Sequence, residues 1–466
     1  MADDITATEI MLKIQLTLML VCTCFTGASP LPIDPIWSTE SFRKAFTASY
    51  GIDSRIEPKL TPEEKEELDL VAKKMATGDR PGAISLMVKS SLLEKSSAML
   101  FNLGSLQFEE GESTQAMSNF RKALKIQPNF RDAHRNLAIA YVQAGDYKEA
   151  EPSLRRAMEL GSQDGLTMGL LGYCLSQSGR SHDALQAYRM AKLTMPDELQ
   201  WQLGEATALM DLDELEEAAS IYEYVLKVSP ERVAIWVNLG DVHLRQGQQL
   251  LAIADLEVAR RLNVLDASAI LSLGHLYLNE TLTEKAMGCY RQALKNPVPL
   301  HFQKFADAVD YLVRYQLWNQ ARQFVMEIRQ AADYDTQIKE DSKSAHQFER
   351  AGAMIEIELG DSEEGVSRLE SLLKKNPLDG LILITLSEHF VGNKETEKAL
   401  MLLERAASID EFTVQAQRRR GEILTLRGDY SAALDALRNA QEIEPNKALE
   451  QYIESIERLS KLHERQ

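Results

Sequence analysis

The side chains that could do acid–base, metal or thiol chemistry are scattered along this 466-residue chain. The eight histidines stand singly, at His134, His182, His243, His275, His301, His346, His389 and His463. Metal and catalytic sites need such groups clustered at fixed spacings. The chain has no phosphate-binding Gly-rich loop ending in Lys-Ser/Thr, no His-Glu-x-x-His and no Gly-x-Ser-x-Gly. We therefore predict a protein that is not an enzyme and holds no metal and no cofactor.

One local cluster of side chains, a run of three arginines, could bind a partner through its charge. Arg418, Arg419 and Arg420 are consecutive, whereas the whole chain has 52 Lys+Arg against 70 Asp+Glu and a net charge of −18. Guanidinium groups bind carboxylates strongly, so we expect a basic patch that includes Arg418 and Arg419 and holds an acidic segment. The alternative is a terminal unit that simply tolerates charge.

The composition restricts what else the chain can bind and how it folds. Its acidity disfavours wholesale nucleic-acid binding, because phosphate backbones carry the same sign of charge. Aromatic residues make up only 7% of the chain. Ala, Leu, Glu, Gln and Arg are plentiful, which favours helix over sheet.

The first 28 residues resemble a signal peptide. An apolar run from Met11 to Phe25 carries Lys13 near its start and precedes the small residues Thr26 and Ala28. The run is short for a bilayer span, which needs about 20 residues. Three acidic residues lie upstream of Met11, so Met11 is a candidate true start. We expect cleavage near residue 28 and export to a periplasm or outside the cell. An uncleaved membrane anchor and a cytoplasmic protein with a frayed apolar helix are the alternatives.

Small residues recur every 34 positions beyond residue 60. Three such series run through the chain: Gly104, Ala138, Gly172, Ala206, Gly240 and Gly274; Ala116, Ala150, Ala184, Ala218, Ala252 and Ala286; and Gly111, Gly145, Gly179, Asp213, Gly247 and Thr281. We interpret the first two as helix-crossing positions and the third as turns. Large residues sit between them, namely Phe120, Leu154, Tyr188, Tyr222, Leu256 and Tyr290. Two helices per unit cannot bury their apolar faces alone, so neighbouring units must stack.

This pattern resembles the tetratricopeptide repeat family, most clearly in Trp236, Leu239, Gly240, Gly247 and Ala252. The resemblance implies an all-α, right-handed α-solenoid of about 10–11 helix pairs with a C-terminal capping helix. We predict a linker with a short helix at residues 29–60, a first array at 61–330 and a second array at 346–447. Residues 331–345 break the register and are an irregular insertion, a helix extension or a hinge. Residues 448–466 form the capping helix.

Two cysteines, Cys174 and Cys289, follow the predicted signal. They lie in units more than three repeats apart, beyond the reach of an intrachain disulfide. We expect buried, inert thiols.

The resemblance also implies a concave groove lined by the first helix of each unit. Matching positions give a predicted groove set: Phe101, Phe108, Arg135, Ile139, Val142, Tyr173, Leu203, Met210, Val237, Asp241, Leu244, Leu271, His275 and Leu278. Arg350 takes a groove position in a later unit and would join the basic patch. The set is largely apolar, which suits a peptide presenting apolar side chains. The alternative is that part of the stripe packs internally. Ser105 and Ile139 stand where a carboxylate clamp needs Asn, so we do not expect that type of binding.

The sequence therefore predicts a non-catalytic interaction scaffold that captures peptide segments or partner domains, in the cell envelope or outside the cell. An accessory subunit of an envelope secretion or assembly machine, an intracellular adaptor of the same family and an enzyme of unrecognised type are the alternatives. The partner is a protein or peptide, not a nucleic acid. No stable membrane span is expected once the signal is removed.

Overall fold

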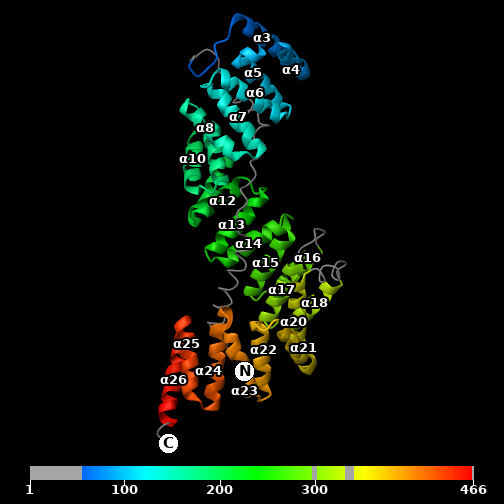
Figure 1. The fold of residues 1–466 in the computed structure, drawn as a ribbon, viewed down its shortest axis with the longest axis vertical. Helices are drawn as coiled ribbons and strands as arrows, with labels where there is room; N and C mark the ends of the chain where they lie inside the picture. Colours follow the sequence, from blue (N-terminus) through cyan, green and yellow to red (C-terminus); the bar gives the residue numbers. More distant parts are fainter. Residues whose placement is uncertain (1–54, 296–301, 331–340, 361, 464–466) are drawn as a thin grey trace. The chain divides into compact units, whose positions relative to one another are not determined.

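The computed structural model describes residues 55–295, 302–330, 341–360 and 362–463. The predicted signal peptide, the predicted linker up to residue 54 and residues 331–340 of the predicted insertion lie outside these residues. Within them, every regular element is a helix and none is a strand. The chain is an all-α solenoid whose consecutive helices pack as antiparallel pairs (Figure 1). The described helices form two compact units, residues 55–264 and residues 265–463.

The first unit, which we call the N-terminal unit, contains six helix pairs and one short 3₁₀ turn. Its elements are α3 (Pro62–Ala76), α4 (Arg80–Lys89), η2 (Leu93–Lys95), α5 (Ser97–Glu109), α6 (Ser113–Ile126), α7 (Arg131–Ala144), α8 (Tyr147–Glu159), α9 (Gly165–Gln177), α10 (Ser181–Thr194), α11 (Leu199–Asp211), α12 (Leu215–Val228), α13 (Val233–Arg245) and α14 (Gln249–Arg261).

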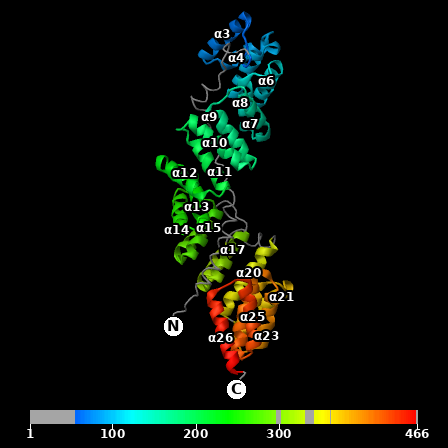
Figure 2. The ribbon, with the colours of Figure 1, turned by 90° about the vertical axis from the view of Figure 1, so that its left-hand side faces the viewer.

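The C-terminal unit contains five pairs and a final single helix among its described residues. Its elements are α15 (Ala267–Asn279), α16 (Thr283–Leu294), α17 (Phe302–Arg314), α18 (Trp318–Arg329), α20 (Ser342–Leu359), α21 (Ser362–Lys375), α22 (Gly380–Gly392), α23 (Thr396–Ala407), η3 (Asp410–Phe412), α24 (Thr413–Arg427), α25 (Tyr430–Ile443) and α26 (Lys447–His463). Helix α26 is the predicted capping helix. Figure 2 shows the paired helices of this unit from the side.

Each pair is close-packed because a small residue of one helix faces a large residue of the other. A Cβ atom added at Gly104 would lie 2.8 Å from the Phe120 ring, and one at Gly274 would lie 2.4 Å from the Tyr290 ring. The six alanines from Ala116 to Ala286 in the second series have no exposed surface. The first two 34-residue series are therefore helix-crossing positions, as the sequence predicts.

The turns between paired helices adopt left-handed backbone conformations. Gly111, Gly145, Gly179 and Gly247 all have positive φ. Asp213 and Thr281, which replace glycine in the same series, keep φ at 64° and 58°. Because a left-handed residue ends a helix sharply, the turn geometry is conserved along the array even where the glycine is not.

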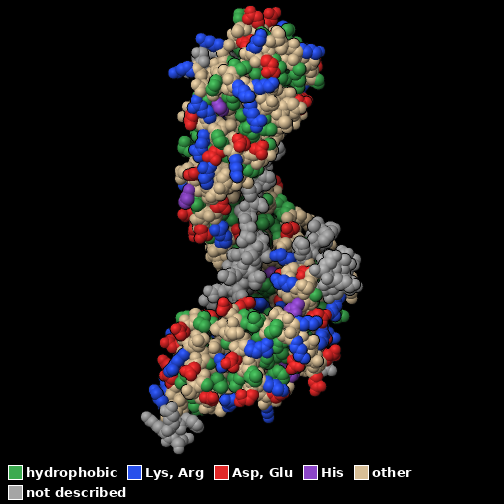
Figure 3. All heavy atoms as spheres, viewed as in Figure 1, with side chains coloured by type: hydrophobic (Ala, Val, Ile, Leu, Met, Phe, Trp, Pro, Cys, Tyr) green, Lys and Arg blue, Asp and Glu red, His purple; other side chains and the backbone are tan. Residues whose placement is uncertain are grey.

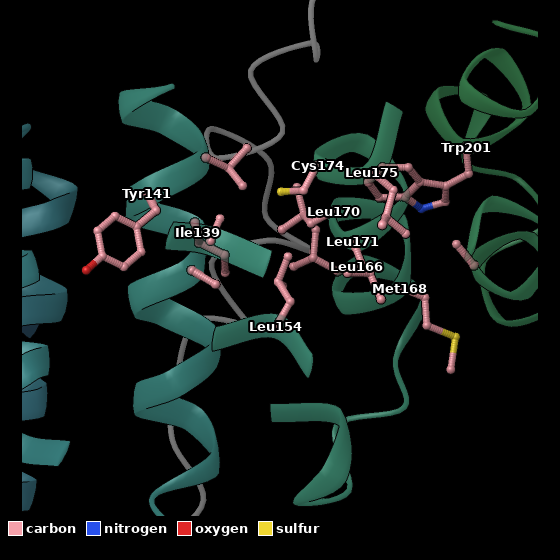
Figure 4. Packing of buried hydrophobic residues seen from close by; sticks show 14 of the residues in the cluster. Ile139, Tyr141, Leu154, Leu166, Met168, Leu170, Leu171, Cys174, Leu175 and Trp201 are labelled. Carbon is pink, nitrogen blue, oxygen red and sulfur yellow. The ribbon is translucent and has the colours of Figure 1, made fainter. Parts of the chain in front are cut away.

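The core of the N-terminal unit is one continuous cluster that runs from helix to helix. Figure 4 shows Ile139 of α7 and Leu154 of α8 meeting the apolar side of α9. Trp201 reaches the same region from α11 and is 1% exposed. Each layer thus completes the core of its neighbour, which is how a solenoid buries apolar surface.

The compact units divide between residues 264 and 265. Helices α17, α18 and α20 pack together, so the helices on the two sides of the predicted insertion belong to one unit. Helix α20 begins at Ser342, because the Asp341 carboxylate accepts hydrogen bonds from the Lys343 and Ser344 backbone N–H groups.

Candidate interaction surfaces

The structure places the predicted groove set on the first helices of six pairs, but in two units. Eleven positions, from Phe101 to Leu244, lie on α5, α7, α9, α11 and α13 of the N-terminal unit. Leu271, His275 and Leu278 lie on α15 of the C-terminal unit. Each subset therefore belongs to its own unit.

Most of the predicted groove set is buried. Eleven of the fourteen side chains fall in this class: Phe101, Phe108, Arg135, Ile139, Val142, Leu203, Met210, Leu244, Leu271, His275 and Leu278. Their apolar stripe belongs largely to the packed interior, which the sequence left open as the alternative. Such residues set how the helices pack, and they offer little surface to a partner.

Two buried members of the predicted groove set, Phe101 and His275, pack against aromatic rings. The Phe101 ring lies 5.7 Å from the Phe120 ring and 4.9 Å from the Phe130 ring, between centroids. His275 stacks on Tyr311 at 4.0 Å and shares a 2.6 Å hydrogen bond between its Nδ1 and the Tyr290 hydroxyl. Burial lowers the pKa of His275 to about 3, so this imidazole stays neutral at physiological pH.

Three members of the set keep accessible surface: Tyr173, Val237 and Asp241. The Tyr173 ring meets the Tyr147 ring edge-on, with centroids 5.5 Å apart. Val237 and Asp241 are one turn apart on α13. The accessible part of the predicted groove in the N-terminal unit therefore combines an aromatic, an aliphatic and an acidic side chain.

Asp241 is the titratable group of this surface, and it should make stability depend on pH. Burial raises its pKa to about 6, against the opposing charge of Arg245. The unfolded carboxyl titrates near pH 3.9. The folded state therefore binds the proton more tightly, and stability falls as pH rises from about 4 to about 6.

We expect Asp241→Asn to raise the free energy of unfolding by about 1–3 kcal/mol at pH 7.5, because it removes a poorly solvated charge. Near pH 4 the effect should vanish, since the native carboxyl is then protonated. Urea unfolding followed by circular dichroism at the two pH values checks this. An equal change at both would contradict it.

Arg350 was predicted to join the basic patch, and the structure shows that this prediction is wrong. Its side chain is buried, 8% exposed, and its guanidinium is bound by two carboxylates. Nη1 donates to Asp379 Oδ2 at 3.0 Å, and Nη2 donates to Asp310. Arg350 is thus an internal ion-pair residue that ties α20 to α17 and to the start of α22, and it is not part of a surface.

The pKa values of Asp310 and Asp379, the two acids bound to Arg350, shift in opposite directions. Burial alone would raise the pKa of Asp379, but Arg350, His346 and the Ile382 backbone N–H hold it below its usual value. Burial raises the pKa of Asp310, although Arg350 and Gln347 oppose the shift. The charge of Arg350 therefore stabilises the ionised form of both carboxyl groups.

Arg418 and Arg419 remain partly exposed on α24. Arg419 Nη1 is 2.8 Å from Glu422 Oε2, one turn along the same helix. Burial raises the pKa of nearby Glu388, and the charge of Arg419 lowers it. The predicted basic patch is thus interleaved with acidic groups. Figure 3 shows the same mixture of charges over the face in view.

One pocket that sequence reasoning missed opens within the C-terminal unit. It measures about 520 Å³ and lies between α18, α20 and α21. Arg322, Arg329 and Arg368 line it together with Glu349 and Glu356 and an apolar floor that includes Val325 and Ile355. Arg368 is held by Glu356 and Glu349. The sequence signal that could have indicated this pocket is the break in the 34-residue spacing, because α20 does not follow α18 at the regular interval.

The described residues contain no group of three or more His, Cys, Asp or Glu side chains placed to hold a metal ion. None of their helices combines the length and apolar character needed to cross a bilayer. Cys174 and Cys289 are both buried, and neither is in a disulfide. Burial raises the pKa of Cys174 to about 12.

Two tetratricopeptide repeat family models match the chain, at residues 107–164 and 203–269. Among curated proteins, the chain is 24% identical over 328 residues to the Protein CTR9 homolog of Arabidopsis thaliana, which covers 63% of this chain and 30% of that protein. It is 20% identical over 380 residues to DnaJ homolog subfamily C member 3 of Gallus gallus, covering 77% and 68%. A third relative is Protein O-mannosyl-transferase TMTC3 of Homo sapiens, 24% identical over 34% of this chain and 19% of that protein. The chain thus spans less than a third of the plant relative.

Solved structures of helical repeat proteins are also similar. The TPR domain of P58(IPK) is 18% identical, with a TM-score of 0.32 over 79% of this chain and 99% of that chain. The pilF protein of Pseudomonas aeruginosa is 20% identical, with a TM-score of 0.38 over 45% and 96%.

Proposed function

We propose that this chain, a tetratricopeptide repeat protein, is a non-catalytic scaffold that captures a peptide segment or partner domain on the first-helix face of its N-terminal unit. Proteins of this family are typically protein-interaction scaffolds and bind protein partners. The observation that carries the proposal is the accessible set Tyr173, Val237 and Asp241, which lies at groove positions of α9 and of α13, two repeats apart. Fold alone does not fix function, so the proposal depends on these side chains.

The chemistry of this set defines the partner that fits. Tyr173 and Val237 offer apolar contact, and Asp241 offers a carboxylate that a partner Lys or Arg would favour in its ionised form. The segment captured would present an apolar side chain near a basic one. Affinity would come from the apolar contacts, and the charge would set specificity.

Paired variants test this surface. We expect Tyr173→Ala and Val237→Glu each to weaken partner capture about tenfold or more, because loss of an anchor typically costs over 1 kcal/mol. Tyr224→Ala and Val228→Glu are matched controls, since both side chains are exposed on the second helix α12. Tagged full-length chains would be mixed with an envelope extract and captured proteins quantified by mass spectrometry. If the controls lose the same proteins, or the Tyr173 and Val237 variants lose none, the surface is not the binding site.

We also propose that the protein is exported. The support is the apolar run at residues 11–25 followed by small residues. N-terminal sequencing of the purified protein tests this: a first residue near 29 agrees with export, and a first residue at Met1 or Met11 contradicts cleavage.

A further inference from the structure

The pocket between α18, α20 and α21 lies in a repeat that lacks a core side chain (Figure 1). In six other repeats, the first helix carries a buried leucine thirteen positions before the small residue of the second helix: Leu103, Leu137, Leu171, Leu239, Leu273 and Leu386. Other residues found at this position are Glu205, Ala308 and Arg420. In the repeat of α20 and α21 the residue is Gly352, thirteen positions before Gly365, and Gly352 lines the pocket.

Neither the backbone nor close packing requires a glycine at position 352. Gly352 lies inside helix α20 and does not have positive φ. A Cβ atom added there would meet one described atom from outside its own turn, Arg368 Nη2 at 3.5 Å, which is an ordinary contact distance. At Gly365 of the same pair, an added Cβ atom would lie 2.7 Å from the Ala353 carbonyl oxygen. Since glycine destabilises a helix interior relative to alanine, Gly352 keeps the pocket open at a cost in stability.

Arginines outnumber carboxylates in the lining of the pocket. Three arginines and two glutamates line it, which leaves one net positive charge. Both glutamates bind Arg368: its Nη1 donates to Glu356 Oε1 at 2.6 Å, and its Nη2 donates to Glu349 Oε2 at 2.8 Å. Arg322 is exposed and has no ion pair within the described part of the chain, and Arg329 lies 4.0 Å from Glu349. Arg322 and Arg329 therefore keep N–H donors for an anion.

The other side chains of the lining are aliphatic. Val325 and Ile355 are buried, and Met326 and Leu359 keep some exposed surface. The volume of about 520 Å³ falls within the range of small-molecule sites, about 300–1,000 Å³. A ligand that matches this lining has an aliphatic part and a single negative charge. A polyanion matches it less well, because the two glutamates would repel it.

We propose that this pocket binds an aliphatic monocarboxylate. Its hydrocarbon part fills the space that a leucine at position 352 would take, in contact with Val325 and Ile355. Its carboxylate is bound by Arg322 and Arg329. These two arginines lie on the same face of α18 as Val325 and Met326, because the four residues follow a spacing of three, four and seven positions.

A titration with 4-methylpentanoate tests this site, since this probe joins a leucine-like hydrocarbon to one carboxylate. Methyl NMR of the full-length chain labelled at isoleucine would report on Ile355. We expect its signal to shift with a Kd on the order of 1 mM or lower. Acetate and 4-methylpentan-1-ol each supply only one part of the probe and should bind at least about tenfold more weakly. An unmoved Ile355 signal, or equal binding of either fragment, would overturn the proposal.

Arginine substitutions test the charge. Arg322→Gln and Arg329→Gln should each weaken 4-methylpentanoate binding about tenfold, because each removes a charge-assisted hydrogen bond to the carboxylate. Arg418→Gln is the matched control, since Arg418 is partly exposed on α24 and does not line the pocket. It should leave the Kd unchanged. A probe that binds both pocket variants as well as the native chain, or that the control weakens equally, would contradict the assignment.

Refilling position 352 tests the shape. Gly352→Leu should abolish probe binding, because its side chain takes the space assigned to the hydrocarbon. Gly352→Ala should keep most of the binding, since its Cβ atom makes only an ordinary contact with Arg368. Helical circular dichroism shows whether each variant is folded, and full binding by a folded Gly352→Leu chain would contradict the proposal. If this variant does not fold, the arginine variants decide. Tyr173 and Val237 lie in the other unit, so this site and the proposed function fail independently.

Discussion

Replacing Arg350 by methionine is expected to lower the free energy of unfolding of the C-terminal unit by about 3–5 kcal/mol. Arg350→Met keeps most of the side-chain volume but removes the cation between Asp310 and Asp379. Both carboxylates are buried, and Asp379 would keep only His346 and its backbone donor as partners. The loss is large because a buried charge without its counter-ion is not solvated.

Guanidinium chloride unfolding followed by circular dichroism measures this loss. Amide hydrogen exchange in α17, α20 and α22 should quicken in the same variant, since the ion-pair cluster joins these helices. Arg419→Met is the matched control, because Arg419 is partly exposed and makes a single surface pair with Glu422. It should change stability by no more than about 1 kcal/mol. Equal losses of unfolding free energy in the two variants would show that the buried ion pairs of Arg350 contribute no more to stability than the surface pair of Arg419.

Trp201→Ala is the second substitution with a large expected effect, about 3–5 kcal/mol in the N-terminal unit. The indole fills the space above Gly169, where an added Cβ atom would come within 2.4 Å of the ring. It also lies beside Tyr188, with ring centroids 6.5 Å apart. Truncation would leave a cavity between α9 and α11 that the flanking helices cannot close without moving their backbones.

Trp236 supplies the control for this substitution. It is partly buried on α13, and its Nε1–H donates to the Pro230 carbonyl oxygen at 3.2 Å, near the edge of its repeat. Trp236→Ala should therefore cost clearly less than Trp201→Ala in the same denaturant titration. Equal losses would mean that the enclosure of Trp201 does not contribute to stability.

The fold was predictable because its information is local and periodic. The 34-residue spacing located the helix crossings and the turns. Helix α20 begins after Asp341, a residue type that commonly caps helices, which is a local signal independent of the repeat. The division between residues 264 and 265 has no counterpart in the repeat, because it depends on how whole layers pack.

The surfaces were less predictable because periodicity gives the face of a helix but not how far that face is covered. Phe101 and Val237 occupy groove positions of the same kind, yet one is buried among rings and the other is accessible. Arg350 carries the same charge as Arg418, and only the positions of Asp310 and Asp379 distinguish an internal ion pair from a surface cation. Such partners are distant in sequence and become visible only in three dimensions.

The layer-by-layer core has a consequence for how the protein is made. Most of the described helices find their main partners in neighbouring helices, within a few dozen residues along the chain. Each pair can therefore gain its contacts soon after it emerges from the ribosome, without waiting for distant segments to be synthesised. The nascent polypeptide would acquire structure in the same order in which it is translated.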